Sequence, residues 1–128
     1  MRKISRLFGG LILVIGVASC GGGGNCPAGT ICMGSANFFT SASTTQPVTL
    51  TVAANTAVTW TNDSGTQHDV IFDDPSTALA VGAGDPGNIP LHTSGSNQRQ
   101  FTTTGHHPFH CSVHGTTTTG MRGDVVVQ

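Results

Sequence analysis

Short stretches in the middle of the chain alternate apolar and polar residues, and this period of two restricts the fold more than any other feature. Residues 48–52 and 58–61 alternate Val, Leu or Trp with Thr, and residues 68–72 place His68, Val70 and Phe72 on one face. Such alternation, with this enrichment in Val and Thr, is typical of half-buried strands. Turn-forming residues separate the stretches at 54–55, 62–65 and 73–75. The pattern predicts an all-β sandwich.

The second half of the chain is expected to complete the sheets. Residues 75–97 are rich in Gly, Pro, Ser and Asn, which predicts loops, one helical turn near 76–81, and at most a short edge strand anchored by Ile89 and Leu91. Strands are predicted to begin at Arg99, to cover 108–111, and to close the sheet at 124–128.

Four side chains with metal-binding atoms stand out. Cys111 and His114 occur in the segment FHCSVH, Met121 follows shortly after, and His68 lies far upstream. A thiolate and two imidazoles with a weak axial thioether form the donor set of an electron-transfer copper site, because soft sulfur favours Cu(I) while imidazole suits both oxidation states. The sequence therefore predicts one type 1 copper per chain.

Two alternatives concern the metal and its fourth ligand. Structural zinc sites use four Cys or His ligands and catalytic ones use three plus water, so a set that contains Met resembles neither, although Zn(II) can occupy such a site in a recombinant protein. Met121 is alternatively a core residue that fills a gap. In that case the axial position is open or taken by a backbone oxygen.

Residues 1–19 are predicted to be an export signal. Three basic residues within the first six precede the apolar run 7–17, which is shorter than the roughly 20 residues that a spanning helix needs. The following Val-Ala-Ser-Cys, which ends at Cys20, resembles the lipobox of bacterial lipoproteins. The resemblance implies that Cys20 is lipidated and becomes the new N-terminus.

The glycine-rich residues 20–36 would then form a flexible tether to a folded domain at 37–128. The alternative is an ordinary signal peptide cut near Ala18 or Cys20. Either interpretation places the domain in the periplasm or at the cell surface.

Without its first 19 residues the chain keeps two arginines and six aspartates, a net charge of about −4, and it has no lysine and no glutamate. This composition argues against nucleic acid or anionic lipid as partners and favours a redox protein with a basic docking face. We expect a monomer that contacts a membrane only through the lipid anchor.

The four cysteines allow three connectivities for two disulfides. If Cys20 carries lipid and Cys111 binds metal, Cys26 and Cys32 remain as a possible pair that closes the loop CPAGTIC. The sequence does not fix the geometry of that pair, so its formation stays open. No CxxCH motif occurs, which excludes a c-type haem.

Residues from about 38 to 128 resemble the cupredoxins, the small blue copper proteins of the plastocyanin, pseudoazurin and amicyanin type. Three stretches carry the resemblance: PVTLTVAANTAVTWTN followed by HDV, then GHHPFHCSVH, and finally GMRGDVVV. The resemblance implies a Greek-key β-sandwich. It assigns copper to His68, Cys111 and His114, with Met121 as the axial ligand.

The resemblance also implies a path for the electron. In this family the second His of the Cys-His pair reaches an apolar surface patch, which predicts His114 as the electron port, with Gly115 and Pro108 or the threonine loop around it. Asn62 and Asp69 are the candidates for hydrogen bonds that orient the ligand rings and tune the reduction potential.

One departure from the family pattern concerns the loop before Met121. Six residues, 115–120, separate it from His114, where the plastocyanin-like pattern has four. Lengthening a flexible loop costs only a fraction of a kcal/mol, and four threonines flanked by glycine can bulge outward without moving the ends of the loop. We therefore expect Met121 to keep the axial position.

The other histidines are expected not to bind this copper. Strand alternation puts His110 on the face opposite Cys111. His92, His106 and His107 are predicted in loops, where binding of a second, adventitious metal is the alternative.

An enzyme is not expected, because the chain has one Trp, no Tyr, no Glu and a single set of copper ligands. The preferred interpretation is a one-electron carrier between redox proteins such as a cytochrome or an oxidase. Two alternatives are a copper-delivery protein of the same fold, which passes the ion through loop histidines, and a lipoprotein that only presents a surface.

Overall fold

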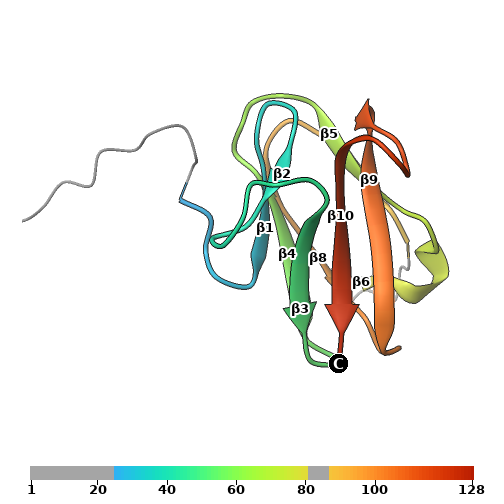
Figure 1. Ribbon diagram of the computed structural model, residues 1–128. Coiled ribbons are helices and arrows are strands. Elements are labelled where there is room, and N and C mark those ends of the chain that lie inside the picture. The colour runs from blue at the N-terminus through green and yellow to red at the C-terminus, as the bar shows by residue number, and fades with distance from the viewer. Residues whose placement is uncertain (1–24, 81–86) are drawn as a thin grey trace, which may run out of the picture.

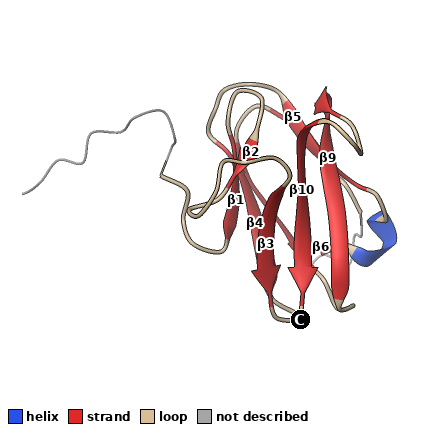
Figure 2. Cartoon of the chain, viewed as in Figure 1, coloured by secondary structure: helices blue, strands red, loops and turns tan. Residues whose placement is uncertain are grey.

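Two five-stranded β-sheets face each other in the computed structural model, which describes residues 25–80 and 87–128 (Figure 1). One short 3-10 helix, η1 (Pro75–Thr77), is the only helix within these two ranges, and it overlaps the expected helical turn (Figure 2). The all-β sandwich predicted from the alternation is confirmed. The strands are β1 (Thr30–Met33), β2 (Phe38–Phe39), β3 (Val48–Val52), β4 (Ala57–Asn62), β5 (His68–Phe72), β6 (Leu79–Ala80), β7 (Ile89–His92), β8 (Gly95–Gln100), β9 (Gly105–Gly115) and β10 (Gly120–Val127).

The strand order brings distant segments of the chain side by side. The first sheet has the order β2-β1-β4-β8-β6, and the second sheet has the order β3-β10-β9-β5-β7. The last strand, β10, lies inside the second sheet, parallel to β3 and antiparallel to β9. Since β9 also pairs with β5, the second sheet places the segments that contain His68, Cys111 and Met121 on neighbouring strands.

The core between the sheets is built from the apolar faces of the alternating strands. In β4, every second residue is buried, including Trp60, which is fully buried. Its ring contacts Phe72, Phe101 and Phe109 at centroid distances of 5.5, 6.4 and 5.5 Å, and such pairs add about 0.5–1.5 kcal/mol each beyond their burial. Phe109 and Cys111 share the buried face of β9, so the aromatic core continues to the thiol.

Strand β1 lies within the predicted tether at 20–36, so the folded domain begins before the predicted boundary at residue 37. All four of its residues are buried, and it pairs in parallel with β4, with Ile31 opposite Trp60. The strand, TICM, is too short to show an alternating pattern, and the glycine-rich sequence around it resembles a loop. Composition alone therefore placed the boundary too late.

A disulfide joins Cys26 to Cys32, whose Cα atoms are 5.8 Å apart. It ties the segment before β1 to that strand. The predicted signal at 1–19 and the predicted lipidation site Cys20 lie outside the described residues. Within the described residues, no helix is long and apolar enough to span a bilayer.

The region between β6 and β9 differs from the expectation in detail. β8 begins at Gly95, before the predicted start at Arg99. The prediction missed this start because the polar residues of the strand do not alternate with apolar ones. Phe101 lies beyond its end and is fully buried. In the edge strand β7, Ile89 is buried as expected, whereas Leu91 is 46% exposed and anchors nothing.

Candidate metal centre

Cys111 and His114 both lie on β9, which spans eleven residues and extends beyond the predicted strand 108–111 at both ends. The thiol is fully buried, since Cys111 continues the inward alternation of Phe109. His114 is only partly buried. The second histidine thus lies within β9, three residues beyond the predicted strand 108–111 and next to the paired residue Gly115.

A large irregularity in the pairing of β9 with β10 surrounds these residues. Gly120 pairs with Gly115, but the next pair joins Arg122 to His110. Four residues of β9, Cys111 to His114, therefore lie opposite Met121 alone. Such a bulge redirects side chains that regular alternation would send to opposite faces. It allows Cys111 and His114 to face the same point.

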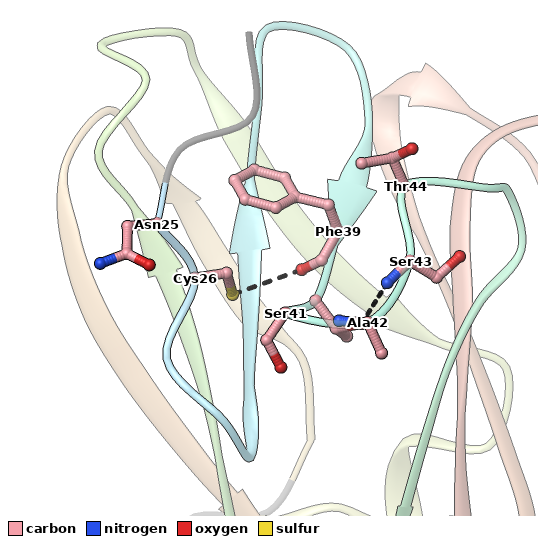
Figure 3. A pocket seen from close by; sticks show the side chains of 8 residues that line it. Asn25, Cys26, Phe39, Ser41, Ala42, Ser43 and Thr44 are labelled. Atoms are coloured by element: carbon pink, nitrogen blue, oxygen red, sulfur yellow. Dashed lines mark hydrogen bonds between the residues drawn. The ribbon is translucent and has the colours of Figure 1, made fainter. Parts of the chain in front are cut away.

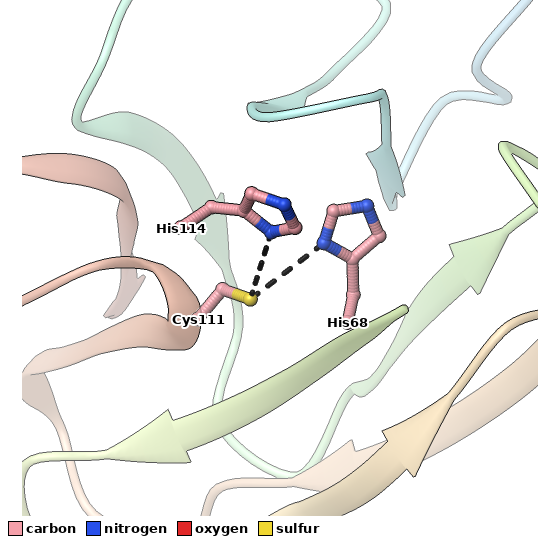
Figure 4. Close-up of side chains that lie close together, drawn as sticks. All are labelled: His68, Cys111 and His114. Carbon is pink, nitrogen blue, oxygen red and sulfur yellow. Dashed lines mark hydrogen bonds between the residues drawn. The ribbon is translucent and has the colours of Figure 1, made fainter. Parts of the chain in front are cut away.

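His68 begins β5, and the pairing of β5 with β9 brings it to the same place. Ile71 lies opposite His110, and the strands run antiparallel. The Nδ1 atoms of His68 and His114 lie 3.6 and 3.7 Å from Cys111 Sγ, and Figure 4 shows both rings turned toward the sulfur. The metal-binding atoms of the three residues all lie within 4.8 Å of one another.

The ring of His68 is oriented by a backbone carbonyl. Its Nε2 lies 2.7 Å from the oxygen of Gly34, so Nε2–H donates and Nδ1 keeps its lone pair. Burial lowers the pKa of His68 below its ordinary 6.5; the hydrogen bond to Gly34 opposes this shift, and the neighbouring His114 ring adds to it. The result is a neutral imidazole with Nδ1 directed at Cys111, which is the form that binds a metal.

Comparison with known proteins identifies the family. Residues 40–128 match the family described as copper binding proteins, plastocyanin/azurin family. The chain belongs to this family.

One sequence relative and two solved structures illustrate the similarity. The chloroplastic plastocyanin of Tetradesmus obliquus is 34% identical over 88 residues, which are 65% of this chain and 57% of the plastocyanin, so the chain spans little more than half of that relative. An oxidised methionine-to-lysine mutant of amicyanin is 22% identical with a TM-score of 0.54, covering 77% of this chain and 80% of the amicyanin. A purple cupredoxin from Nitrosopumilus maritimus is 22% identical with a TM-score of 0.52, covering 77% and 98%. At these identities, the two structures support the cupredoxin fold alone.

The donor set fits the copper of this family. One thiol and two imidazoles converge from buried or half-buried positions, and copper in both oxidation states accepts such ligands. The predicted cofactor, one type 1 copper per chain, therefore agrees with both the family and the site. Zinc would lack the closed set of Cys and His that its structural sites use.

Met121 lies at the start of β10 and is fully buried in the core cluster. It is the one β10 residue that faces the four-residue bulge of β9, between the pairs of Gly120 and Arg122. A long, unbranched thioether in this position can reach toward the three donors, and it also packs against the core. The position of Met121 is thus compatible with both interpretations from the sequence, an axial ligand and a core residue.

The six-residue segment 115–120 is a closed turn. Thr116 N–H donates to the Thr119 carbonyl at 2.8 Å, and Thr116 Oγ1 accepts from the N–H groups of Thr118 and Thr119. The turn therefore satisfies its own hydrogen bonds outside the Gly115–Gly120 pair. This arrangement explains how two additional residues are accommodated without separating His114 from Met121.

Asp69 follows His68 and holds the residue after the thiol. Its Oδ1 accepts from the Ser112 backbone N–H at 2.7 Å, and its Oδ2 accepts from Ser112 Oγ at 2.5 Å. Asp69 is only 6% exposed. This carboxylate connects β5 to β9 beside Cys111, so it orients the segment that carries the thiolate. The sequence had suggested instead that Asp69 orients a ligand ring.

Asn62, the other predicted orienting residue, also bonds elsewhere. Its Nδ2 donates to the carbonyls of Thr66 and His92 at 2.8 and 3.0 Å, and its Oδ1 accepts from Ser64. These bonds hold the loop that leads into His68. The group that does contact the ring, the Gly34 carbonyl, carries no sequence signal, because every residue has one.

The predicted positions of the other histidines need correction, because His92, His106 and His107 lie on strands and not in loops. His107 is buried between Thr77 Oγ1 and the Thr103 carbonyl. His106 pairs with Asp124 on β10. Within the described ranges, the group of metal-binding side chains at His68, Cys111 and His114 contains none of these three.

His110 lies on the opposite face of β9 from Cys111, as predicted, with its Nδ1 3.4 Å from Asp73.

Proposed function

We propose that this cupredoxin carries single electrons, with copper held by Cys111, His68 and His114 and with Met121 on the axis. The observation that carries the proposal is the convergence of one thiol and two oriented imidazoles within 4.8 Å of one another. Copper, when bound, supplies the one-electron chemistry by cycling between Cu(I) and Cu(II). The chain belongs to a family of copper-binding proteins, and its described residues hold one set of metal-binding side chains. We therefore propose no enzymatic role.

The residues of the chain supply the restraint that fast electron transfer needs. Cys111 and His68 are fully buried, and their positions are fixed by the Ser112–Asp69 and Gly34–His68 hydrogen bonds. Ligands held in this way move little when the charge of the metal changes. The buried position also excludes water from the thiolate, which protects it from oxidation.

The half-buried His114 is the proposed electron port. It lies beside Val113, which is 50% exposed, and beside the exposed threonine turn. Pro108, the other predicted neighbour, is six residues away along β9, or roughly 20 Å at the usual strand rise, so it is not part of this surface. The proposed docking surface thus consists of the end of β9 and the turn at 116–119.

The wider setting is proposed from the sequence. Residues 1–19 would direct export, Cys20 would carry the lipid, and the domain would act in the periplasm or at the cell surface as a monomer. Redox proteins such as a cytochrome or an oxidase are the proposed partners. The few charges on the chain make electrostatic steering of a partner modest.

Copper delivery through loop histidines is less well supported. His92, His106 and His107 lie on strands, and each has a hydrogen-bonded ring nitrogen. Within the described ranges, none of the three belongs to the group of metal-binding side chains at His68, Cys111 and His114.

Absorption and EPR spectra of the purified protein after addition of Cu(II) test the proposal. We expect an intense visible thiolate-to-copper band and narrow copper hyperfine splitting. Cys111→Ser should abolish the band, and Met121→Ala should shift it, which would identify the axial ligand. A colourless protein with an ordinary tetragonal Cu(II) signal would contradict the electron-carrier proposal and favour copper handling.

A further inference from the structure

We propose that the Cys26–Cys32 disulfide is a positioning element of the copper centre, because it fixes the hairpin whose Gly34 carbonyl orients His68. The inference rests on copper binding through His68, not on the electron-carrier role. It assigns a function at the site to a covalent bond that provides no ligand atom.

The first link is the hydrogen bond between the hairpin and the ring. Gly34 follows β1, and its carbonyl oxygen lies 2.7 Å from His68 Nε2. His68 comes from the second sheet and Gly34 from the end of a strand in the first sheet. A shift of the hairpin by a fraction of an ångström would therefore lengthen this bond or turn the ring away from Cys111.

The second link is the tight turn that presents the carbonyl. Gly34 N–H donates to the Asn37 carbonyl at 2.8 Å, which closes the connection between β1 and β2. A Cβ atom at Gly34 would meet the side-chain oxygen of Asn37, so a larger residue would require the Asn37 side chain to move. The direction of the carbonyl is thus fixed by the hairpin as a unit.

The third link is the disulfide itself. Cys32 lies two residues before Gly34 on β1, and Cys26 Sγ lies 3.3 Å from the Thr30 carbonyl and 3.5 Å from the Phe39 carbonyl. Figure 3 shows the sulfur turned toward the Phe39 carbonyl of β2. The disulfide therefore contacts both strands of the hairpin.

Strand pairing restrains the two strands of the hairpin unequally. β2 has only two residues and pairs with β1 alone, at the edge of the first sheet. Beside it lies a recess of about 400 Å³ lined by Cys26, Phe39 and residues 40–44 (Figure 3). With the disulfide open, the hairpin would be held by the β1–β4 pairing and by its buried side chains, including Met33 and Phe38.

The double variant Cys26→Ser/Cys32→Ser tests the proposal. In the metal-free protein, we expect the His68 Nε2–H signal in proton–nitrogen NMR to exchange faster with water, because its acceptor has become mobile. We also expect the affinity for copper to fall about tenfold, within the range usual for coupled sites. Unchanged exchange of this N–H together with unchanged affinity would overturn the proposal.

The matched control is Val127→Ala. Val127 is buried at the far end of β10 from Met121, where it pairs with Val52 and Gly105, so its truncation should lower stability at a distance from the site. It should leave the His68 N–H signal unchanged. An equal change in both variants would mean that general loss of stability explains the result, which would also overturn the proposal.

If the double variant does not fold, the wild-type disulfide can be reduced in the folded, metal-free protein with an excess of a small thiol, and the same N–H signal followed. Retention of the signal after reduction would refute the positioning role. The spectrum of the copper-loaded wild type is recorded separately, so failure of the electron-carrier proposal remains distinguishable from failure of this one.

Discussion

The two sheets of this cupredoxin contribute differently to the proposed copper site. The second sheet carries every proposed ligand, on β5, β9 and β10, whereas the first sheet contributes one backbone carbonyl, at Gly34. Both register irregularities recorded in the described sheets lie in the second sheet, one beside His68 and the other beside Met121. The strand pairs of the first sheet are regular.

The difference shows where irregular backbone is useful. Regular alternation sends neighbouring side chains to opposite faces, so ligands three residues apart on one strand do not converge unless the pairing is broken. The second sheet breaks its pairing at the site, and the regular first sheet packs against it through the aromatic core. We therefore expect substitutions in the first sheet mainly to lower stability, and substitutions at the irregular pairing of the second sheet also to change the copper spectrum.

Trp60→Ala should have the largest effect, because it removes the centre of the core on the regular sheet. Loss of a fully buried aromatic side chain costs roughly 3–5 kcal/mol of unfolding free energy. Urea denaturation of the metal-free protein measures this change. Leu91→Ala, at an exposed position, is the control and should change stability by less than about 0.5 kcal/mol.

Gly120→Ala should come next and should disturb the irregular sheet at the site. Gly120 has φ 74°, and a Cβ there would collide with the His114 carbonyl. Gly65 has nearly the same φ, 73°, but open space around its Cβ position. Gly65→Ala should thus cost only the conformational penalty of roughly 1–2 kcal/mol. Gly120→Ala should cost more and also shift the copper spectrum, and equal effects would refute the importance of the close contact.

Asp69→Ala should cost roughly 1–3 kcal/mol, because it removes a buried carboxylate that accepts part-buried hydrogen bonds from the Ser112 N–H and hydroxyl. Asp69→Asn keeps an acceptor for that N–H and removes the negative charge. We expect the asparagine variant to retain the fold and to raise the reduction potential, since a nearby carboxylate favours Cu(II). Cyclic voltammetry checks the potential; an unchanged value in Asp69→Asn would limit Asp69 to a structural role.

The smallest effect concerns the pH dependence of the metal-free protein. The pKa of His68 is lowered below 6.5 by burial, so below that pH the unfolded chain binds a proton that the folded protein does not. Stability should be constant above pH 6.5 with respect to this group, fall below it, and level off at the folded pKa. Urea unfolding across this range should show the slope in the wild type, and His68→Gln should reduce it.

The sequence predicted the sandwich and the donor residues because both depend on side-chain identity. Alternating Val and Thr indicate strands, and a thiol with two imidazoles indicates copper. The Gly34 carbonyl could not be predicted, since it is a backbone group positioned by tertiary structure. β1 and β8 were obscured for related reasons: one is too short to alternate, and the other is polar along its whole length.

The turn at 116–119 satisfies its own hydrogen bonds, and the Gly115–Gly120 pair separates it from the ligands. Its exposed threonines nevertheless lie next to the partly exposed His114. The proposed docking surface and the proposed ligands thus lie in adjacent pieces of chain that have largely separate hydrogen bonds. We therefore expect residues 116–119 to tolerate substitutions that suit a new partner while the spectrum and the reduction potential of the bound copper stay unchanged.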